Sequence, residues 1–194
     1  ANRFLKRLWR LVNAHMSQGP TDALIVANLN KAQKDLRRKT HETIAKVDDD
    51  YGRRQTFNTA IAAVMELCNE VIKLEGDSPS NRAVVDEALR AALQMLCPIV
   101  PHVTEHLWSA LTGGNILDAG WPTVDDQALT RDEIEIVVQV NGKVRAKLTV
   151  SASADKAAVE AAALAHENVL RFLEGLSVRK VIVVPGKLVN IVAN

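Results

Sequence analysis

The sequence predicts a multi-domain protein in which an all-α antiparallel helical bundle is followed by a small α+β domain. Three observations lead to this prediction. Apolar residues recur at helical spacing up to about residue 111, they alternate at the two-residue spacing of strands after residue 133, and a polar stretch separates the two patterns. A length of 194 residues suits one medium and one small domain. We expect domains at 1–123 and 133–194, with a linker at 124–132.

The first expected helix covers residues 2–16, where apolar residues recur every three or four positions. The opposite face carries four basic residues, Arg3, Lys6, Arg7 and Arg10. Gly19-Pro20 breaks the pattern, so the helix is expected to end before it. One side of this helix is therefore predicted to pack and the other to be cationic.

A second, long helix is expected to reach about residue 47. Thr21 or Asp22 can cap its N-terminus, and the acidic residues 48–50 with Gly52 can end it. Its middle carries a second basic cluster, Lys34, Arg37, Arg38 and Lys39.

Three further helices complete the expected bundle. The first covers residues 55–74, the next runs from about 81 to 96 before Pro98, and the last starts at Pro101 and ends near Leu111. The apolar stripe expected on helix 55–74 consists of Phe57, Ile61, Val64, Met65, Cys68, Val71 and Ile72. Five helices with short connections are typical of an antiparallel bundle.

The small domain begins with a predicted hairpin around Asn141-Gly142. A three-residue loop with a left-handed Gly142 would pair Val138 with Val144 and keep the apolar residues of both strands on one side. In this register Lys143, Arg145 and Lys147 share the polar face, and Glu135 is the expected partner of Lys147. Helices near 155–165 and 168–173 follow, and strands at 178–184 and 188–192 flank Pro185-Gly186.

The bulk composition is that of a folded soluble protein. Hydrophobic residues are 47% and charged residues 24%, which excludes disordered and fibrous classes. No apolar run approaches the roughly 20 residues of a membrane helix, so no membrane partner and a cytoplasmic location are expected. Cys68 and Cys97 stand alone in the sequence and are expected to be reduced thiols. The first residues, Ala-Asn-Arg, lack a Met and already fit a helix, so we expect a segment of a longer protein.

The formal net charge of +1 is unevenly distributed. Residues 1–54 hold 12 Lys/Arg against 6 Asp/Glu and carry +6, residues 55–133 hold 4 against 12 and carry −8, and residues 134–194 hold 8 against 5 and carry +3. Two basic segments therefore flank an acidic one, which favours an anionic partner at the two ends.

No catalytic or metal site is expected. His102 and His106 with Glu105 match a zinc hydrolase pattern, but no third ligand stands in a recognisable motif, so zinc is not predicted. No Ser/His/Asp or Cys/His arrangement is evident, and the glycines lack the spacing of a phosphate-binding loop.

Two segments of the bundle resemble class I aminoacyl-tRNA synthetases. Phe57-Asn58-Thr59-Ala60-Ile61-Ala62-Ala63-Val64-Met65-Glu66-Leu67 is similar to a recurrent helix of their anticodon-binding domain. Residues 96–108, Leu-Cys-Pro-Ile-Val-Pro-His-Val-Thr-Glu-His-Leu-Trp, resemble the next marker of that domain, and Trp121-Pro122 follows as the family pattern implies. The resemblance implies a bundle of the class I anticodon-binding type.

The C-terminal segments narrow this resemblance. Residues 138–145, Val-Gln-Val-Asn-Gly-Lys-Val-Arg, and residues 179–192 resemble the terminal domain of bacterial-type leucyl-tRNA synthetases. Ser151–Ala154 departs from the family, which has a Pro- or Asp-containing turn there. A valyl or isoleucyl relative stays open from the bundle markers alone.

The resemblance implies a tRNA-binding portion without catalytic residues. In the family, leucine activation with ATP and Mg belongs to upstream domains, and the HIGH- and KMSKS-type signatures of those domains do not occur here. The implied partners are tRNA(Leu) and the upstream catalytic and editing domains, with no DNA. A protein docking module is the alternative function.

Basic residues are the candidate contacts, because RNA is bound largely through phosphates and shape. The candidates in the small domain are Lys143, Arg145, Lys147, Arg179, Lys180 and Lys187. Those in the bundle are Arg3, Arg7, Arg10, Lys34, Arg37 and Arg38. Stacking of bases on aromatic residues is not expected, because these are only 4% of the chain and most fall on apolar faces.

Overall fold

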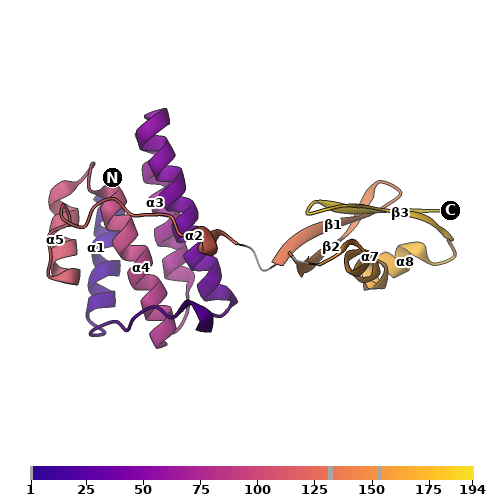
Figure 1. The fold of residues 1–194 in the computed structure, drawn as a ribbon, viewed down its shortest axis with the longest axis horizontal. Helices are drawn as coiled ribbons and strands as arrows, with labels where there is room; N and C mark the ends of the chain where they lie inside the picture. The colour runs from indigo at the N-terminus through magenta and orange to yellow at the C-terminus, as the bar shows by residue number, and fades with distance from the viewer. Residues whose placement is uncertain (1, 131–132, 153) are drawn as a thin grey trace. The chain divides into compact units, whose positions relative to one another are not determined.

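The computed structural model describes residues 2–130, 133–152 and 154–194. The chain forms two compact units, a helical unit at Ala1–Thr130 and a sheet unit at Arg131–Asn194 (Figure 1). This confirms the predicted fold class. Of the expected linker, residues 131–132 lie outside the described residues, as does Ser153 in the departing turn. Among the described residues, no helix is long and apolar enough to cross a membrane.

The helical unit is built from five main helices. Their bounds are α1 Asn2–Met16, α2 Lys31–Asp49, α3 Phe57–Lys73, α4 Pro79–Leu96 and α5 Pro101–Thr112. Ser78 caps α4 by accepting a hydrogen bond from the Asn81 N–H, and Gly113 ends α5 in the left-handed conformation at φ 75°. The expected helix 2–16 is confirmed at both ends, and the expected fourth and fifth helices agree within two residues at each end.

The start of α2 differs from the expectation. Neither Thr21 nor Asp22 caps it, because the chain stays extended there and forms only a short 3₁₀ turn at Val26–Asn28. Asn30 is the cap: its side chain accepts from the Gln33 N–H while the Gln33 side chain accepts from the Asn30 N–H. Two reciprocal hydrogen bonds fix the helix start at Lys31.

The connection from α2 to α3 is a π-helical turn, η2, at Asp50–Arg54 rather than a break at Gly52. Asp50 is fully buried at its start and accepts hydrogen bonds from Lys46, Thr56 and Thr59. Gln55 then adopts a left-handed φ of 53°, which redirects the chain into α3. One carboxylate therefore ties the end of α2 to the start of α3.

The Asp50 carboxylate makes the stability of this turn dependent on pH. The hydrogen bond from Lys46 lowers the pKa of Asp50 to about 2, against a burial effect that raises it. Because the folded pKa lies below the ordinary 3.8, the stabilisation is present above about pH 4 and is lost as the pH falls toward 2. The variant Asp50→Asn should lower the urea midpoint at neutral pH, and the gap to the parent chain should shrink at about pH 3. A gap that stays constant with pH would contradict this assignment.

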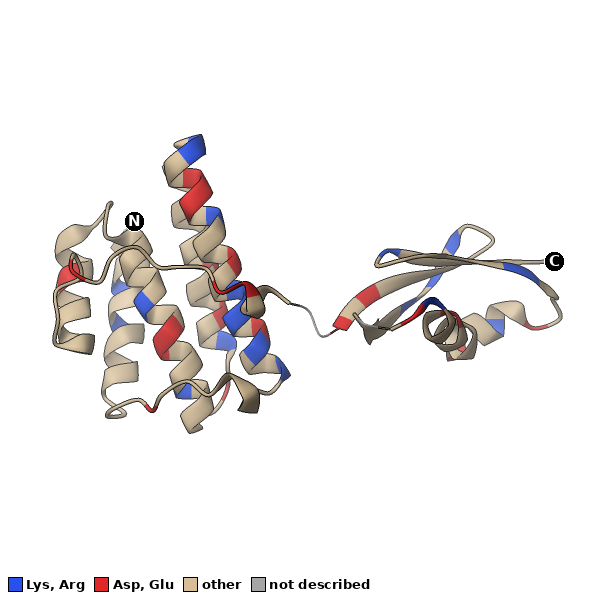
Figure 2. Cartoon of the chain, in the orientation of Figure 1, with Lys and Arg blue, Asp and Glu red and all other residues tan. Residues whose placement is uncertain are grey.

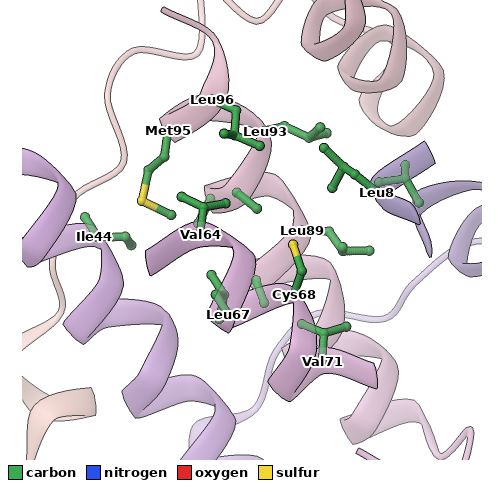
Figure 3. Packing of buried hydrophobic residues seen from close by; sticks show 14 of the residues in the cluster. Leu8, Ile44, Val64, Leu67, Cys68, Val71, Leu89, Leu93, Met95 and Leu96 are labelled. Carbon is green, nitrogen blue, oxygen red and sulfur yellow. The ribbon is translucent and has the colours of Figure 1, made fainter. Parts of the chain in front are cut away.

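The core of the helical unit lies between α3, α4 and the helices on either side of them (Figure 3). On α3 the buried face is formed by Ala60, Ala63, Val64, Leu67, Cys68 and Val71. Phe57, Met65 and Ile72 were expected in this stripe, but they are 49%, 36% and 52% exposed. The small Ala60 and Ala63 face the core instead and are 0% and 3% exposed. Burial raises the pKa of the Cys68 thiol to about 12, and neither cysteine forms a disulfide.

After α5 the chain returns across the bundle and reaches a short helix, α6, at Asp126–Leu129. This segment falls in the expected linker, yet Ala128 is buried and α6 contacts α2. Arg37 donates to the Asp125 carboxylate at 2.7 Å, and the Asp125 N–H donates to Nδ1 of His41 at 3.0 Å. The chain is therefore held on the bundle up to about residue 129.

The sheet unit has four strands in the order β2-β1-β4-β3. The strands are β1 Glu133–Val140, β2 Lys143–Ser151, β3 Val178–Val184 and β4 Leu188–Ala193, and the helices are α7 Lys156–Ala165 and α8 Glu167–Leu173. The strands β1 and β4 pair in parallel, and the pairs β1–β2 and β3–β4 are antiparallel. Both helices pack on one side of the sheet, where Val159, Ala163 and Val169 meet the buried residues of the strands (Figure 1). Within the described residues of the sheet unit, no helix covers the other side of the sheet, which we call the open side.

The hairpin differs from the predicted register. Asn141 and Gly142 have φ of 48° and 76°, as a two-residue type I′ turn requires. Val140 pairs with Lys143 and Val138 pairs with Ala146, so Arg145 is an extra residue in β2 and forms a bulge. The expected pairing of Val138 with Val144 is therefore wrong. The tight turn is favoured because the Asn141 side chain exchanges two hydrogen bonds with the backbone of Ala193 on β4.

Candidate nucleic-acid interface

The basic face of α1 is on the surface of the helical unit. Arg3, Lys6 and Arg10 are exposed and form no ion pair with any described residue, whereas Arg7 is half-buried. The spacing of these four residues places them on one side of the helix. Lys and Arg are blue in Figure 2. The cationic face predicted for this helix therefore exists and is accessible.

Arg7 connects this face to a groove along α2 and α3. Two adjoining hollows of about 450 and 500 Å³ share Lys39, Glu70 and Lys73 in their walls. We call this surface the α2/α3 groove; its charged residues are Arg7, Arg38, Lys39, Lys73, Asp35, Glu42, Glu66 and Glu70. Arg7 of the cluster predicted on the first helix and Arg38 and Lys39 of the cluster predicted on the second therefore line one groove. The sequence reasoning missed Lys73, whose position at the end of α3 gives no signal by itself.

Carboxylates neutralise most of the groove. Lys39 lies 3.1 Å from Glu66, Lys73 lies 2.8 Å from Glu70, and Arg38 lies 2.7 Å from Asp35. These pairs are at least partly exposed, so each is weak and can exchange for a phosphate. Lys34, the other candidate on α2, is exposed beside the groove and has an interaction of its own.

Arg37 is not part of this surface. Only 7% of it is exposed, and its Nε donates to both carboxylate oxygens of Glu87 at 3.3 and 3.2 Å. Its Nη2 donates to Asp125, whose pKa this hydrogen bond lowers. The prediction of Arg37 as an RNA contact is therefore wrong, because three acceptors from α4 and the segment before α6 already occupy its guanidinium.

In the sheet unit the bulge separates the three basic residues of β2. Directly paired residues share one side of a sheet. Lys143 pairs with Val140 and so lies on the side of the sheet that the helices cover, whereas Lys147 pairs with Val137 and lies on the open side. Their predicted common face is wrong. The expected contact of Lys147 with Glu135 is confirmed at 2.9 Å, although Glu135 is directly opposite Thr149.

Arg145 turns toward α8 instead of the open face. Its Cζ lies 3.8 Å from the ring centroid of Phe172, which is itself 45% exposed. The Nε of Arg145 is buried and has no hydrogen-bond partner within the described part of the chain. The sequence reasoning missed Phe172, because nothing in the sequence pairs a helix residue with a strand residue 27 positions earlier.

The remaining candidates lie away from β2. Arg179 and Lys180 are on β3, at the opposite edge of the sheet, and Nε of Arg179 donates to the Asn194 side chain at 2.6 Å. Lys187 is exposed in the turn before β4. The six predicted residues are therefore distributed over both edges of the sheet and one turn, and they do not form a single patch.

The zinc-like motif on α5 has other contacts. Glu105 accepts a hydrogen bond from the Ile116 N–H at 2.9 Å, and His106 stacks on Trp9 at 4.9 Å between ring centroids. Trp9, Phe57, Trp121 and Phe172 are each between 38% and 49% exposed. The expectation that aromatic residues are hidden on apolar faces is thus wrong for these four.

Comparison with known protein families gives a match over most of the chain. Residues 33–161 match the family model described as the anticodon-binding domain of tRNA ligase. The match begins in α2 and extends through the hairpin into α7.

Curated relatives match along the whole chain. A leucine–tRNA ligase of Marinobacter nauticus is 63% identical over 195 residues, and one of Alcanivorax borkumensis is 62% identical. Each comparison covers 100% of this chain but 23% and 24% of the relative, respectively. The chain therefore spans about a quarter of the length of the curated relatives it matches.

The fold is also found in a solved structure. It matches the ternary complex of Agrobacterium radiobacter K84 agnB2 LeuRS with tRNA and LeuAMS, with a TM-score of 0.77 and 24% identity. The match covers 99% of this chain and 25% of that one.

Proposed function

Because this chain belongs to the anticodon-binding domain family of tRNA ligases, we propose that it is the tRNA-binding part of a leucine–tRNA ligase. The observation that carries this proposal is the identity of 62–63% to leucine–tRNA ligases along the entire chain, including the sheet unit. These relatives favour leucine over valine or isoleucine as the amino acid of the parent enzyme.

We propose that this chain binds the tRNA and that other segments of the parent enzyme carry out the chemistry. Leucine activation with ATP and Mg, and transfer to tRNA(Leu), belong to other segments of the parent enzyme, which works in the cytoplasm. This chain supplies affinity through exposed cations on two separate units. Such contacts position the RNA without reading its sequence.

The experiment is a titration of tRNA(Leu) with this chain over a range of salt concentrations. One variant removes three cations of the helical unit, Arg3→Ala, Lys6→Ala and Arg10→Ala; the other removes Lys143, Lys147 and Lys180 in the sheet unit in the same way. Each lost phosphate contact should reduce the slope of log K against log salt by about 0.7–0.9, and affinity at low salt should fall roughly tenfold or more.

A matched control removes three exposed cations outside these surfaces, Arg53, Arg54 and Lys156. Its affinity and slope should stay close to those of the parent chain. If both test variants also bind with unchanged affinity and slope, tRNA binding by these surfaces is refuted.

A further inference from the structure

Where α8 meets β2, the sheet unit exposes an aromatic ring with a guanidinium on it. Val169 and Leu173 of α8 pack into the core of the unit, but Phe172 is 45% exposed. Leu176 is 42% exposed, and Leu170, which lies two residues before Phe172 and so on a different face of α8, is 53% exposed. The ring therefore contributes little to the core and forms part of an accessible apolar surface.

The β2 bulge is what brings Arg145 to this ring. In a regular strand Arg145 would share a side with Lys147, two residues later. The extra residue instead leaves Arg145 without a partner on β1 and directs it over Phe172. Bulges that re-aim a side chain are common next to functional sites.

The Arg145 guanidinium is not neutralised by a carboxylate. It forms no ion pair with any described residue, and its buried Nε has no acceptor among them. A guanidinium carries five N–H donors, and a buried donor without an acceptor is rare in folded proteins. The positive charge of Arg145 is therefore not balanced within the described residues and is available to a ligand beside an aromatic face, although the Nε itself is buried.

We propose that Phe172 and Arg145 form a stacking site for one unpaired nucleobase of the bound tRNA. A base has a flat π-face that stacks on an aromatic ring or on a guanidinium plane, and its phosphate is anionic. Lys143 lies on the same side of the sheet as Val140 and Ala146, and so adds a cation for that phosphate. An acidic peptide would use the charge but not the ring. This inference rests on the proposed function and adds a specific base contact to it.

The test compares Phe172→Ala with Leu170→Ala in tRNA titrations. Loss of one stacked base should weaken binding about tenfold for Phe172→Ala, whereas Leu170→Ala, an equally exposed residue of the same helix, should have little effect. Phe172→Ala removes no charge, so its salt slope should stay unchanged, while Arg145→Gln should reduce the slope by about 0.7–0.9. Phe172→Leu keeps apolar bulk and should bind as weakly as Phe172→Ala.

A direct readout uses Phe172→Trp, which should bind at least as tightly as the parent chain. Its added tryptophan should be quenched by tRNA and by a short single-stranded oligoribonucleotide, while a tryptophan placed by Leu170→Trp should not. Parent-like binding by Phe172→Ala and Phe172→Leu would overturn the stacking site, and the proposed function would stand if the cation variants still bind weakly. The stacking site would also be overturned if an acidic peptide quenched the fluorescence of the tryptophan at position 172 and RNA did not.

Discussion

Replacing Arg37 with alanine is expected to destabilise the helical unit by about 2–3 kcal/mol. The guanidinium joins α2 to Glu87 on α4 and to Asp125 before α6 through three hydrogen bonds of 2.7 to 3.3 Å. Nε2 of His41, also on α2, donates to the same Glu87 at 3.2 Å, because Nδ1 of His41 accepts from the Asp125 N–H. Removing the cation leaves Glu87, whose side chain is only 24% exposed, without its main partner. This partial exposure places the cost below that of a fully buried pair.

Tryptophan fluorescence can measure this loss in urea, because Trp9, Trp108 and Trp121 are the only tryptophans and all lie in the helical unit. Arg38→Ala is the matched control on the same helix. Its pairs with Asp35 and Glu42 are partly exposed, so its cost should stay below about 1 kcal/mol. Equal losses in the two variants would show that Arg37 is not a structural ion pair. At urea concentrations at which the Arg37→Ala variant stays folded, the salt dependence of its tRNA binding should be unchanged.

The parts of the fold that were predicted correctly are those with local signals. The helix of Asn2–Met16 follows from its apolar spacing and from Gly19-Pro20 after it. Pro98 and Pro101 mark the end of α4 and the start of α5, because proline restricts the backbone conformations available. Such signals act within one or two turns of a helix and can be read from the sequence alone.

The errors come from contacts between residues far apart in the chain. Arg37 looks like any other residue of a basic cluster, and only Glu87 and Asp125, 50 and 88 positions later, make it structural. On α3, apolar spacing alone did not distinguish Phe57 at the surface from Ala60 in the core. Composition and periodicity indicate which residues can be buried. Which of them are buried depends on their packing partners in the folded chain.

The candidate site shows the same limit. The sequence correctly identified a hairpin at Asn141-Gly142, but the register depends on Ala193 and Asn190 of β4, which hydrogen bond to the turn. A shift of one residue moves a side chain to the other side of a sheet. For this reason the predicted polar face of three cations became two separated lysines and an arginine on Phe172.

The variant Asn141→Ala is expected to destabilise the sheet unit by about 3 kcal/mol. Nδ2 of Asn141 donates to the Ala193 carbonyl at 2.8 Å, and the Ala193 N–H donates to Oδ1 at 3.0 Å. Alanine loses both bonds and must also adopt a φ of 48°, which costs an L-residue with a Cβ about 1 kcal/mol or more. A small unit has only a few kcal/mol of total stability, so a large part of it would be lost.

Two further variants separate the causes of this loss. Asn141→Gly removes the hydrogen bonds but accepts the left-handed φ, so it should recover about 1 kcal/mol relative to alanine. Asn141→Asp keeps the acceptor for the Ala193 N–H but opposes the Ala193 carbonyl with a carboxylate, so it should stay less stable than the parent chain. Amide hydrogen exchange in β1 and β4 measures each change, with the helical unit as the internal reference. If the amides of β1 and β4 are no better protected in Asn141→Gly than in Asn141→Ala, the left-handed conformation of Asn141 contributes nothing to stability. Its two side-chain hydrogen bonds then account for the whole effect.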